Sequence, residues 1–140
     1  MAPVVVDTNV VVAGLITARA DAPTVRIVEG LLGAAFPFAL SVALLAEYRR
    51  VLTRPKLRAT HGLRPADIDG ILEAMARHSI VFEPAPAELR APDPGDQHLW
   101  DLLAVHPDLR LVTGDALLLA SREMAGRVVS AAGFAAALQR

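Results

Sequence analysis

The stretch that decides the fold reads PVVVDTNVVV at residues 3–12, where a short β-branched run stops at an acidic residue. Three consecutive valines before Asp7 predict a buried strand. Asp7, Thr8 and Asn9 are cap-type residues, so a helical segment is expected to follow directly. A strand that leads straight into a helix is typical of α/β proteins.

The rest of the chain repeats this alternation of strand and helix. Further apolar runs predict strands at residues 36–40, 79–82, 109–112 and 128–129. Caps and apolar periodicity predict helices near residues 10–16, 25–34, 42–52, 65–78, 96–105, 115–122 and 131–138. Residues 56–63 are interpreted as a basic connection and residues 83–95, with four prolines, as a loop. Together they predict an α/β fold, a three-layer α/β/α sandwich with a central parallel sheet, formed by residues 1–140 as a single domain.

Composition narrows the class of protein. Of the 140 residues 54% are hydrophobic but only 4% aromatic, which indicates an aliphatic core and favours α/β over a β-sandwich. The chain has no cysteine, so a disulfide framework and a thiolate metal site are both excluded, and a cytoplasmic protein is expected. No uncharged apolar run reaches the roughly 18 residues of a membrane helix, so no membrane association is expected. The apolar start lacks the basic segment of a signal peptide.

Four acidic residues lie downstream of predicted strands: Asp7, Glu47, Asp96 and Asp115. The carboxyl ends of parallel strands share one edge of a sheet, so we expect these side chains to converge there. Clustered carboxylates repel one another, and a bound Mg²⁺ or Mn²⁺ ion usually compensates their negative charge. Each acid alone has an ordinary alternative: helix capping for the aspartates, and an ion pair with Arg50 for Glu47. The metal-site hypothesis therefore depends on all four together.

Several neighbours of these acids carry oxygen atoms that would orient them. Thr8 and Asn9 follow the first acid, and Thr113 precedes the last. Asp93, three residues before Asp96, is either a further supporting acid or part of an Asp-Pro turn. None of the four histidines has close metal-ligand spacing, and the chain shows no Ser-His-Asp arrangement.

A basic segment follows Glu47. The net charge is −1, yet residues 48–66 contain six of the fourteen basic residues and no acid. Such a patch either binds a phosphate backbone or is an ordinary solvated face. The candidate nucleic-acid contacts within it are Arg49, Arg50, Arg54, Lys56 and Arg58.

Four segments also carry a family resemblance. Residues 4–12, VVVDTNVVV, resemble the opening motif of the PIN-domain family. Residues 41–56, SVALLAEYRRVLTRPK, resemble its second segment, residues 93–100, DPGDQHLW, its third, and residues 111–115, LVTGD, its fourth. The match spans nearly the whole chain, and it is closest to the VapC-like branch, the toxins of toxin–antitoxin pairs.

The resemblance implies a metal-dependent ribonuclease with the three-layer fold. Asp7, Glu47, Asp96 and Asp115 would be the catalytic, metal-binding acids, with Mg²⁺ or Mn²⁺ as cofactor, RNA as substrate, a small antitoxin as partner and a homodimer as a further assembly. Many relatives carry another acid two residues after the last aspartate, where this chain has Leu117. That difference would weaken a second metal site.

Other functions remain open at this level. An aspartyl-phosphate phosphatase or a receiver module also starts with a strand ending in Asp, but each usually has a second acid where this chain has Asn9. A catalytically silent PIN-like module that binds RNA or supports assembly is the third alternative.

Overall fold

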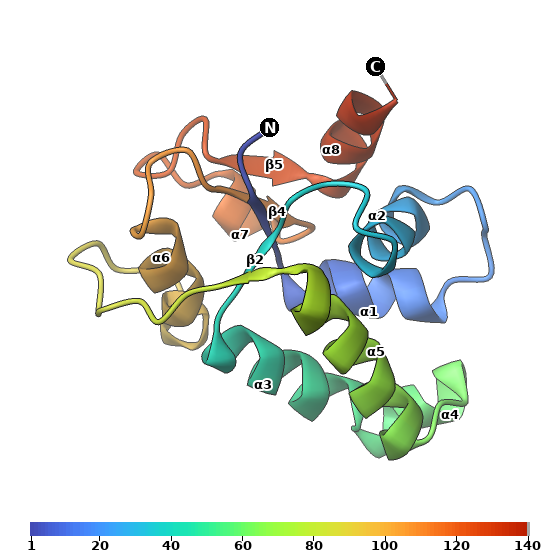
Figure 1. Cartoon of the computed structure of the whole chain (residues 1–140). Helices are drawn as coiled ribbons and strands as arrows, with labels where there is room; N and C mark the ends of the chain where they lie inside the picture. Colours follow the sequence, from blue (N-terminus) through green and yellow to red (C-terminus); the bar gives the residue numbers. More distant parts are fainter. Residues whose placement is uncertain (140) are drawn as a thin grey trace.

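The computed structural model describes residues 1–139, and within them a parallel sheet is flanked by helices (Figure 1). The strands are β1 (Val4–Val6), β2 (Ala39–Leu40), β3 (Ile80–Val81), β4 (Arg110–Thr113) and β5 (Val128–Ser130). The helices are α1 (Thr8–Ile16), α2 (Pro23–Leu32), α3 (Val42–Leu52), α4 (Pro55–His61), α5 (Pro65–His78), α6 (Gln97–Leu103), α7 (Ala116–Leu119) and α8 (Ala131–Leu138), and a 3₁₀ turn spans Pro94–Asp96. The predicted α/β class is confirmed.

The strands run in the order β3-β2-β1-β4-β5, and every pairing is parallel. A single bridge between Val4 and Phe38 joins the β2–β3 pair to the other three strands. In the β1–β4 pair Val6 lies opposite Val112, so both strands end at the same level. The residues that follow β1 and β4 are therefore brought to one edge of the sheet.

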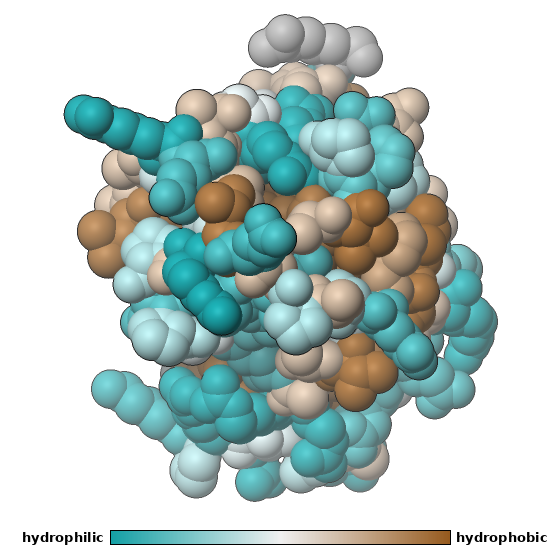
Figure 2. All heavy atoms as spheres, turned by 90° about the vertical axis from the view of Figure 1, so that its left-hand side faces the viewer, coloured by the Kyte–Doolittle hydropathy of each residue, from teal (hydrophilic) through white to brown (hydrophobic). Residues whose placement is uncertain are grey.

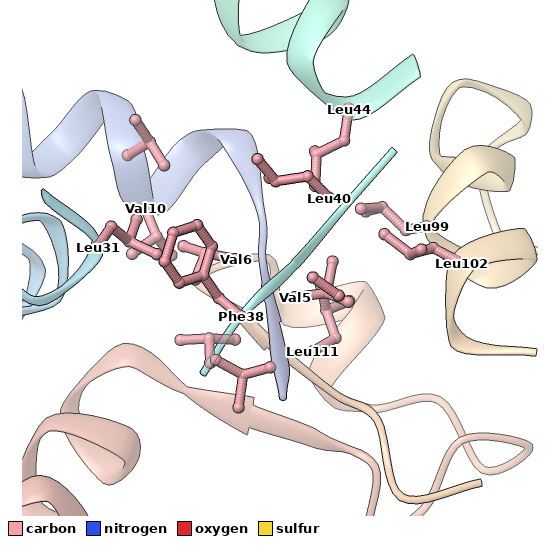
Figure 3. Packing of buried hydrophobic residues seen from close by; sticks show 14 of the residues in the cluster. Val5, Val6, Val10, Leu31, Phe38, Leu40, Leu44, Leu99, Leu102 and Leu111 are labelled. Atoms are coloured by element: carbon pink, nitrogen blue, oxygen red, sulfur yellow. The ribbon is translucent and has the colours of Figure 1, made fainter. Parts of the chain in front are cut away.

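Alternation along β1 divides the core into two layers (Figure 3). Val6 points toward Val10 of α1 and Leu31 of α2, whereas Val5 points toward Leu102 of α6 and Leu111 of β4. The three valines of β1 are at most 1% exposed, as expected for a central parallel strand covered on both faces. Helices α1 and α2 thus cover one face of the sheet and α6 the other, which is the expected three-layer arrangement.

Local signals explain where α3 begins and how it is held. The Ser41 hydroxyl accepts a hydrogen bond from Leu44 N at 3.1 Å, which is a standard amino-terminal cap. Leu44, Tyr48 and Leu52 form the buried stripe of the helix, each at most 1% exposed. Because Glu47 precedes Tyr48, it lies at the edge of this stripe and faces the sheet edge instead of open solvent.

One prediction for the basic segment was wrong. Residues 56–63 were expected to form an irregular connection, but most of them belong to α4. Pro55 stands in the first turn of this helix, and Gly62 ends it with a φ of 69°. Proline at the start and a left-handed glycine at the end are helix-boundary signals, and the dense positive charge concealed them.

Other element boundaries differ less. The helix expected from residue 25 starts at Pro23, and the helix expected through Arg122 ends at Leu119. Trp100 is fully buried, as expected for a core residue.

Strand β3 forms one edge of the sheet, and its residues Ile80 and Val81 are 44% and 50% exposed. Figure 2, seen from the left-hand side of Figure 1, shows hydrophobic residues between hydrophilic ones on that face. Among residues 1–139, no helix combines the length and the apolar character needed to cross a bilayer.

Candidate functional site

The four acids predicted from the sequence line one pocket at the carboxyl edge of the sheet. Its volume is about 490 Å³. Asp7 directly follows β1, Asp115 follows β4, Glu47 projects from α3, and Asp96 closes the 3₁₀ turn before α6. Segments more than a hundred residues apart in sequence therefore contribute to the same hollow.

Asp7 is the most firmly held of the acids. It is 5% exposed and accepts hydrogen bonds from Thr8 N at 2.8 Å, Thr113 Oγ1 at 2.7 Å and Asn9 Nδ2 at 3.2 Å. Burial raises its pKa, the bonds from Thr113 and Thr8 oppose that rise, and the charges of Glu47 and Asp115 add to it. The capping interpretation and the pocket position both apply, because one carboxylate oxygen caps α1 and the other bonds to side chains.

Glu47 is held by three side chains from different elements. Thr8 Oγ1 donates to its Oε2 at 2.9 Å, His98 Nε2 lies 2.8 Å from the same oxygen, and Arg50 Nη2 lies 3.8 Å from Oε1. The His98 contact has the distance of an ion pair without the directionality of a hydrogen bond. The sequence had not selected His98 for the site; its position two residues after Asp96 was the available signal.

Asp96 is half-buried and does not use its side chain to cap α6. Partial burial raises its pKa to about 6, with further increases from the charges of Asp7, Asp93, Asp115 and Glu47. Asp93 itself is exposed and accepts a hydrogen bond from Gly95 N at 2.7 Å, as in an Asp-Pro turn. Asp93 thus affects the pocket through its charge and does not line it.

Thr113 connects the first and last acids. Its hydroxyl donates to Asp7 Oδ2 and accepts from Asp115 N at 3.0 Å. Asp115 in turn accepts a hydrogen bond from Leu117 N at 2.9 Å, which caps α7. Asn9 reaches across to the same segment, since its Oδ1 accepts from Gly114 N at 3.2 Å. Leu117, two residues after Asp115, is 68% exposed.

Tyr48 is a buried residue that holds two walls of the pocket together. It is 1% exposed, and its hydroxyl donates to the carbonyl of Val6, the residue before Asp7. Burial raises its pKa well above 10.0, and the charges of Asp7 and Glu47 raise it further. This bond fixes α3, which carries Glu47, against the end of β1, so the separation of the two acids is set by the core.

The basic segment divides between two faces. Arg50 and Arg54 line the pocket, one helical turn apart. Arg49 points elsewhere, because its Nε donates to Asp69 Oδ1 of α5 at 2.7 Å. Lys56 and Arg58 are exposed on α4, outside the pocket lining. The structure therefore brings two of the five candidate cations to the acids.

The pocket fits a divalent cation by its chemistry. All four acids supply hard oxygen donors. Burial raises the pKa of Asp7 and of Asp96, and the charges of the other acids add to both rises, so a cation would relieve both costs. Within residues 1–139 no three acidic or histidine side chains meet closely enough to enclose an ion by themselves. The carboxylates stand around the walls of the pocket, as expected for like charges.

Comparison with known proteins agrees with this geometry. The family model described as PIN domain matches residues 3–116, a span that contains all four acids. The comparison with curated proteins gave no match.

Proposed function

Because the chain belongs to the PIN domain family, which indicates nuclease activity, we propose that it is a metal-dependent endoribonuclease that hydrolyses RNA phosphodiester bonds. The observation that carries this proposal is the shared pocket. Four carboxylates from four separate segments of the chain line it, together with two arginines. A core built only for stability would not collect four like charges in one place.

The residues of the chain have distinct tasks in this proposal. Asp7, Glu47, Asp96 and Asp115 would hold Mg²⁺ or Mn²⁺. The bound cation would supply an activated water and would stabilise negative charge on the phosphoryl oxygens. Asp7 is the anchor, because three hydrogen bonds fix both of its oxygens before any ligand arrives.

The polar neighbours act by orienting these acids. Thr113 and Asn9 direct Asp7, and Thr8 and His98 direct Glu47. Partners of this kind typically contribute about 10–100-fold to metal affinity or activity. The arrangement supports a site that is rigid around Asp7 and Glu47.

RNA would enter from the side of α3. Arg54 has no acidic partner among the described residues, and Arg50 has only a loose contact with Glu47, so both guanidinium groups are available to phosphates. Lys56 and Arg58 of α4 extend the positive surface beyond the pocket. Arg49 is expected to contribute least, since Asp69 already neutralises it.

The toxin assignment is the finer part of the proposal. It draws support from the resemblance of the four sequence segments to the toxin branch. In a toxin–antitoxin pair a small antitoxin would cover the acidic pocket, and a basic side chain would complement the four acids. A homodimer would bury exposed apolar side chains such as Val42, which is 70% exposed, and Leu117, which is 68% exposed. Growth arrest on expression, relieved by the product of a neighbouring reading frame, would support this assignment.

The main test is Asp7→Asn. We expect the variant to fold normally and to lose Mn²⁺-dependent cleavage of single-stranded RNA by about 100-fold or more, because metal catalysis supplies several kcal/mol. Asp21→Asn is the matched control, since Asp21 is exposed and outside the pocket. EDTA should abolish the wild-type activity.

Two results would contradict the proposal. Undiminished cleavage by Asp7→Asn would remove the assigned role of this residue. RNA binding and Mn²⁺ binding by calorimetry, without any cleavage by the wild type, would instead favour the silent binding module.

A further inference from the structure

The pocket has two halves of opposite chemistry. One half is formed by the acids. The other is lined by apolar side chains of α1 and α3, namely Val12, Ala13, Ile16 and Val51. A cation needs only the first half, so the second half is not explained by metal binding.

The apolar half follows from the sequence of α1. Residues 8–16, TNVVVAGLI, contain no charged residue, although α1 is not enclosed on all sides. Val10 and Val11 are buried, whereas Val12 and Ala13 are half-buried and Ile16 is 36% exposed. A helix with one solvent-facing side normally places polar residues there. Here that side presents aliphatic groups to the pocket.

The neighbouring charges indicate what covers this wall. Arg50 and Val51 lie on α3 and Arg54 directly precedes α4, and all three line the pocket, so aliphatic and guanidinium groups stand close together along one side of it. Nucleic-acid strands place complementary groups close together, with a flat apolar base face beside each phosphate. A cation-binding edge, an apolar wall and two arginines together match one nucleotide and the phosphates next to it.

We propose that Val12, Ile16 and Val51 form a subsite for the nucleobase next to the cleaved phosphodiester, with Arg50 and Arg54 on the adjoining phosphates. This inference rests on the proposed function and adds the place where the base next to the cleaved bond is held. A base within a duplex is stacked and paired and does not lie against such a wall, so the subsite requires single-stranded RNA. Aliphatic groups offer no hydrogen bonds to base edges, so this position accepts any base.

The experiment combines a protein variant with an altered RNA. Octauridylate is compared with the same oligonucleotide carrying one abasic ribose, moved along the chain position by position. For the wild type, we expect an abasic ribose at one position beside the cut to lower kcat/KM by about three- to tenfold, as apolar contact is lost. Ile16→Ala should cause a similar loss with intact RNA and little further loss with that abasic RNA.

Ile80→Ala is the matched control. Ile80 is exposed to a similar degree, 44% against 36%, but lies on β3 and does not line the pocket. Its substitution should leave both kcat/KM values unchanged. Fluorescence anisotropy with the same oligonucleotides in Ca²⁺ gives the affinity independently of cleavage.

The outcomes are separable. Equal effects of Ile16→Ala and Ile80→Ala, or additive losses from Ile16→Ala and the abasic ribose, would overturn the subsite. If the wild type does not cleave but binds with base-dependent, Ile16-sensitive affinity, the proposed activity fails and the subsite stands. If octauridylate is neither cleaved nor bound, both are overturned.

Discussion

Asp7 and Asp96 face the same pocket, yet the protein treats them differently. Asp7 is almost fully buried and receives three hydrogen bonds from the chain. Asp96 is half-buried, stands at the end of a 3₁₀ turn, and caps nothing with its side chain. The pKa of both is raised, but only Asp7 has donors that oppose the rise. The contrast teaches that one acid is stabilised by hydrogen bonds from the fold, whereas the burial and repulsion of the other are not offset by any such bond.

The largest expected effect comes from making Asp7 resemble Asp96. Thr113→Val removes the hydroxyl that donates to Asp7 and accepts from Asp115 N. We expect a 10–100-fold loss of metal-dependent cleavage, because an orienting partner is lost. The free energy of unfolding should fall by about 1–3 kcal/mol, since buried polar groups lose a partner.

Denaturant unfolding and the cleavage assay measure the two effects. Thr60→Val is the matched control, because Thr60 is exposed on α4. Wild-type activity and stability in Thr113→Val would mean that Asp7 needs no support from β4.

The next prediction concerns the stability cost of the Asp96 charge. Its folded-state pKa is about 6 and its ordinary value is 3.8, so the folded protein binds more protons than the unfolded protein between these values. In EDTA the contribution of Asp96 to the free energy of unfolding is therefore most favourable below pH 3.8 and is lost as the pH rises through 6. Asp96→Asn should raise the free energy of unfolding at neutral pH by about 1 kcal/mol, a figure reduced for solvent screening of a half-exposed group.

Thermal unfolding in EDTA across this pH range measures the difference. The advantage of Asp96→Asn over the wild type should shrink as the pH falls through 6 and vanish below 3.8. Asp21→Asn leaves Asp96 in place, so this variant should show no advantage over the wild type that varies with the titration of Asp96. A variant that is less stable than the wild type at neutral pH would contradict an energetic cost of burying the charge of Asp96 among the other acids.

The smallest effect tests a similar contrast in two adjacent arginines: Arg49 is hydrogen-bonded to Asp69, whereas Arg50 has only a loose contact with Glu47. Arg50→Ala should weaken binding of single-stranded RNA and reduce the slope of log affinity against log salt by about 1. Arg49→Ala should leave both quantities unchanged, because Arg49 is bonded to Asp69. Equal salt slopes for the two variants would show that RNA does not follow the pocket side of α3.

Particular elements show how much of the fold could be predicted from the sequence. The strand before Asp7 was predictable because a β-branched run in a central strand is buried on both faces, and the one before Asp115 because its short run is mainly apolar. The strand expected at residues 36–40 is regular only at Ala39 and Leu40. Phe38 adds a single bridge to Val4, and Phe36 is buried by packing against other aromatic rings. The helix α4 was missed because its charge resembled that of a loop.

In the site, the pattern of strands predicted which acids would be neighbours, but not what holds them. The contacts of Glu47 with Thr8 and His98 join residues 39 and 51 positions away, and they depend on how α1 and α6 pack. No local periodicity carries that information. The division of Arg49 and Arg50 between two faces depends in the same way on where Asp69 lies.

The hydrogen bond between Thr113 and Asp7 spans 106 positions of sequence, and this has a consequence for synthesis of the protein. Until β4 has emerged from the ribosome and paired with β1, Asp7 lacks its strongest donor and Asp115 is absent. A nascent chain that carries only α1 to α5 therefore lacks the complete pocket. The proposed nuclease would be inert toward the messenger from which it is being translated until β4 has been made.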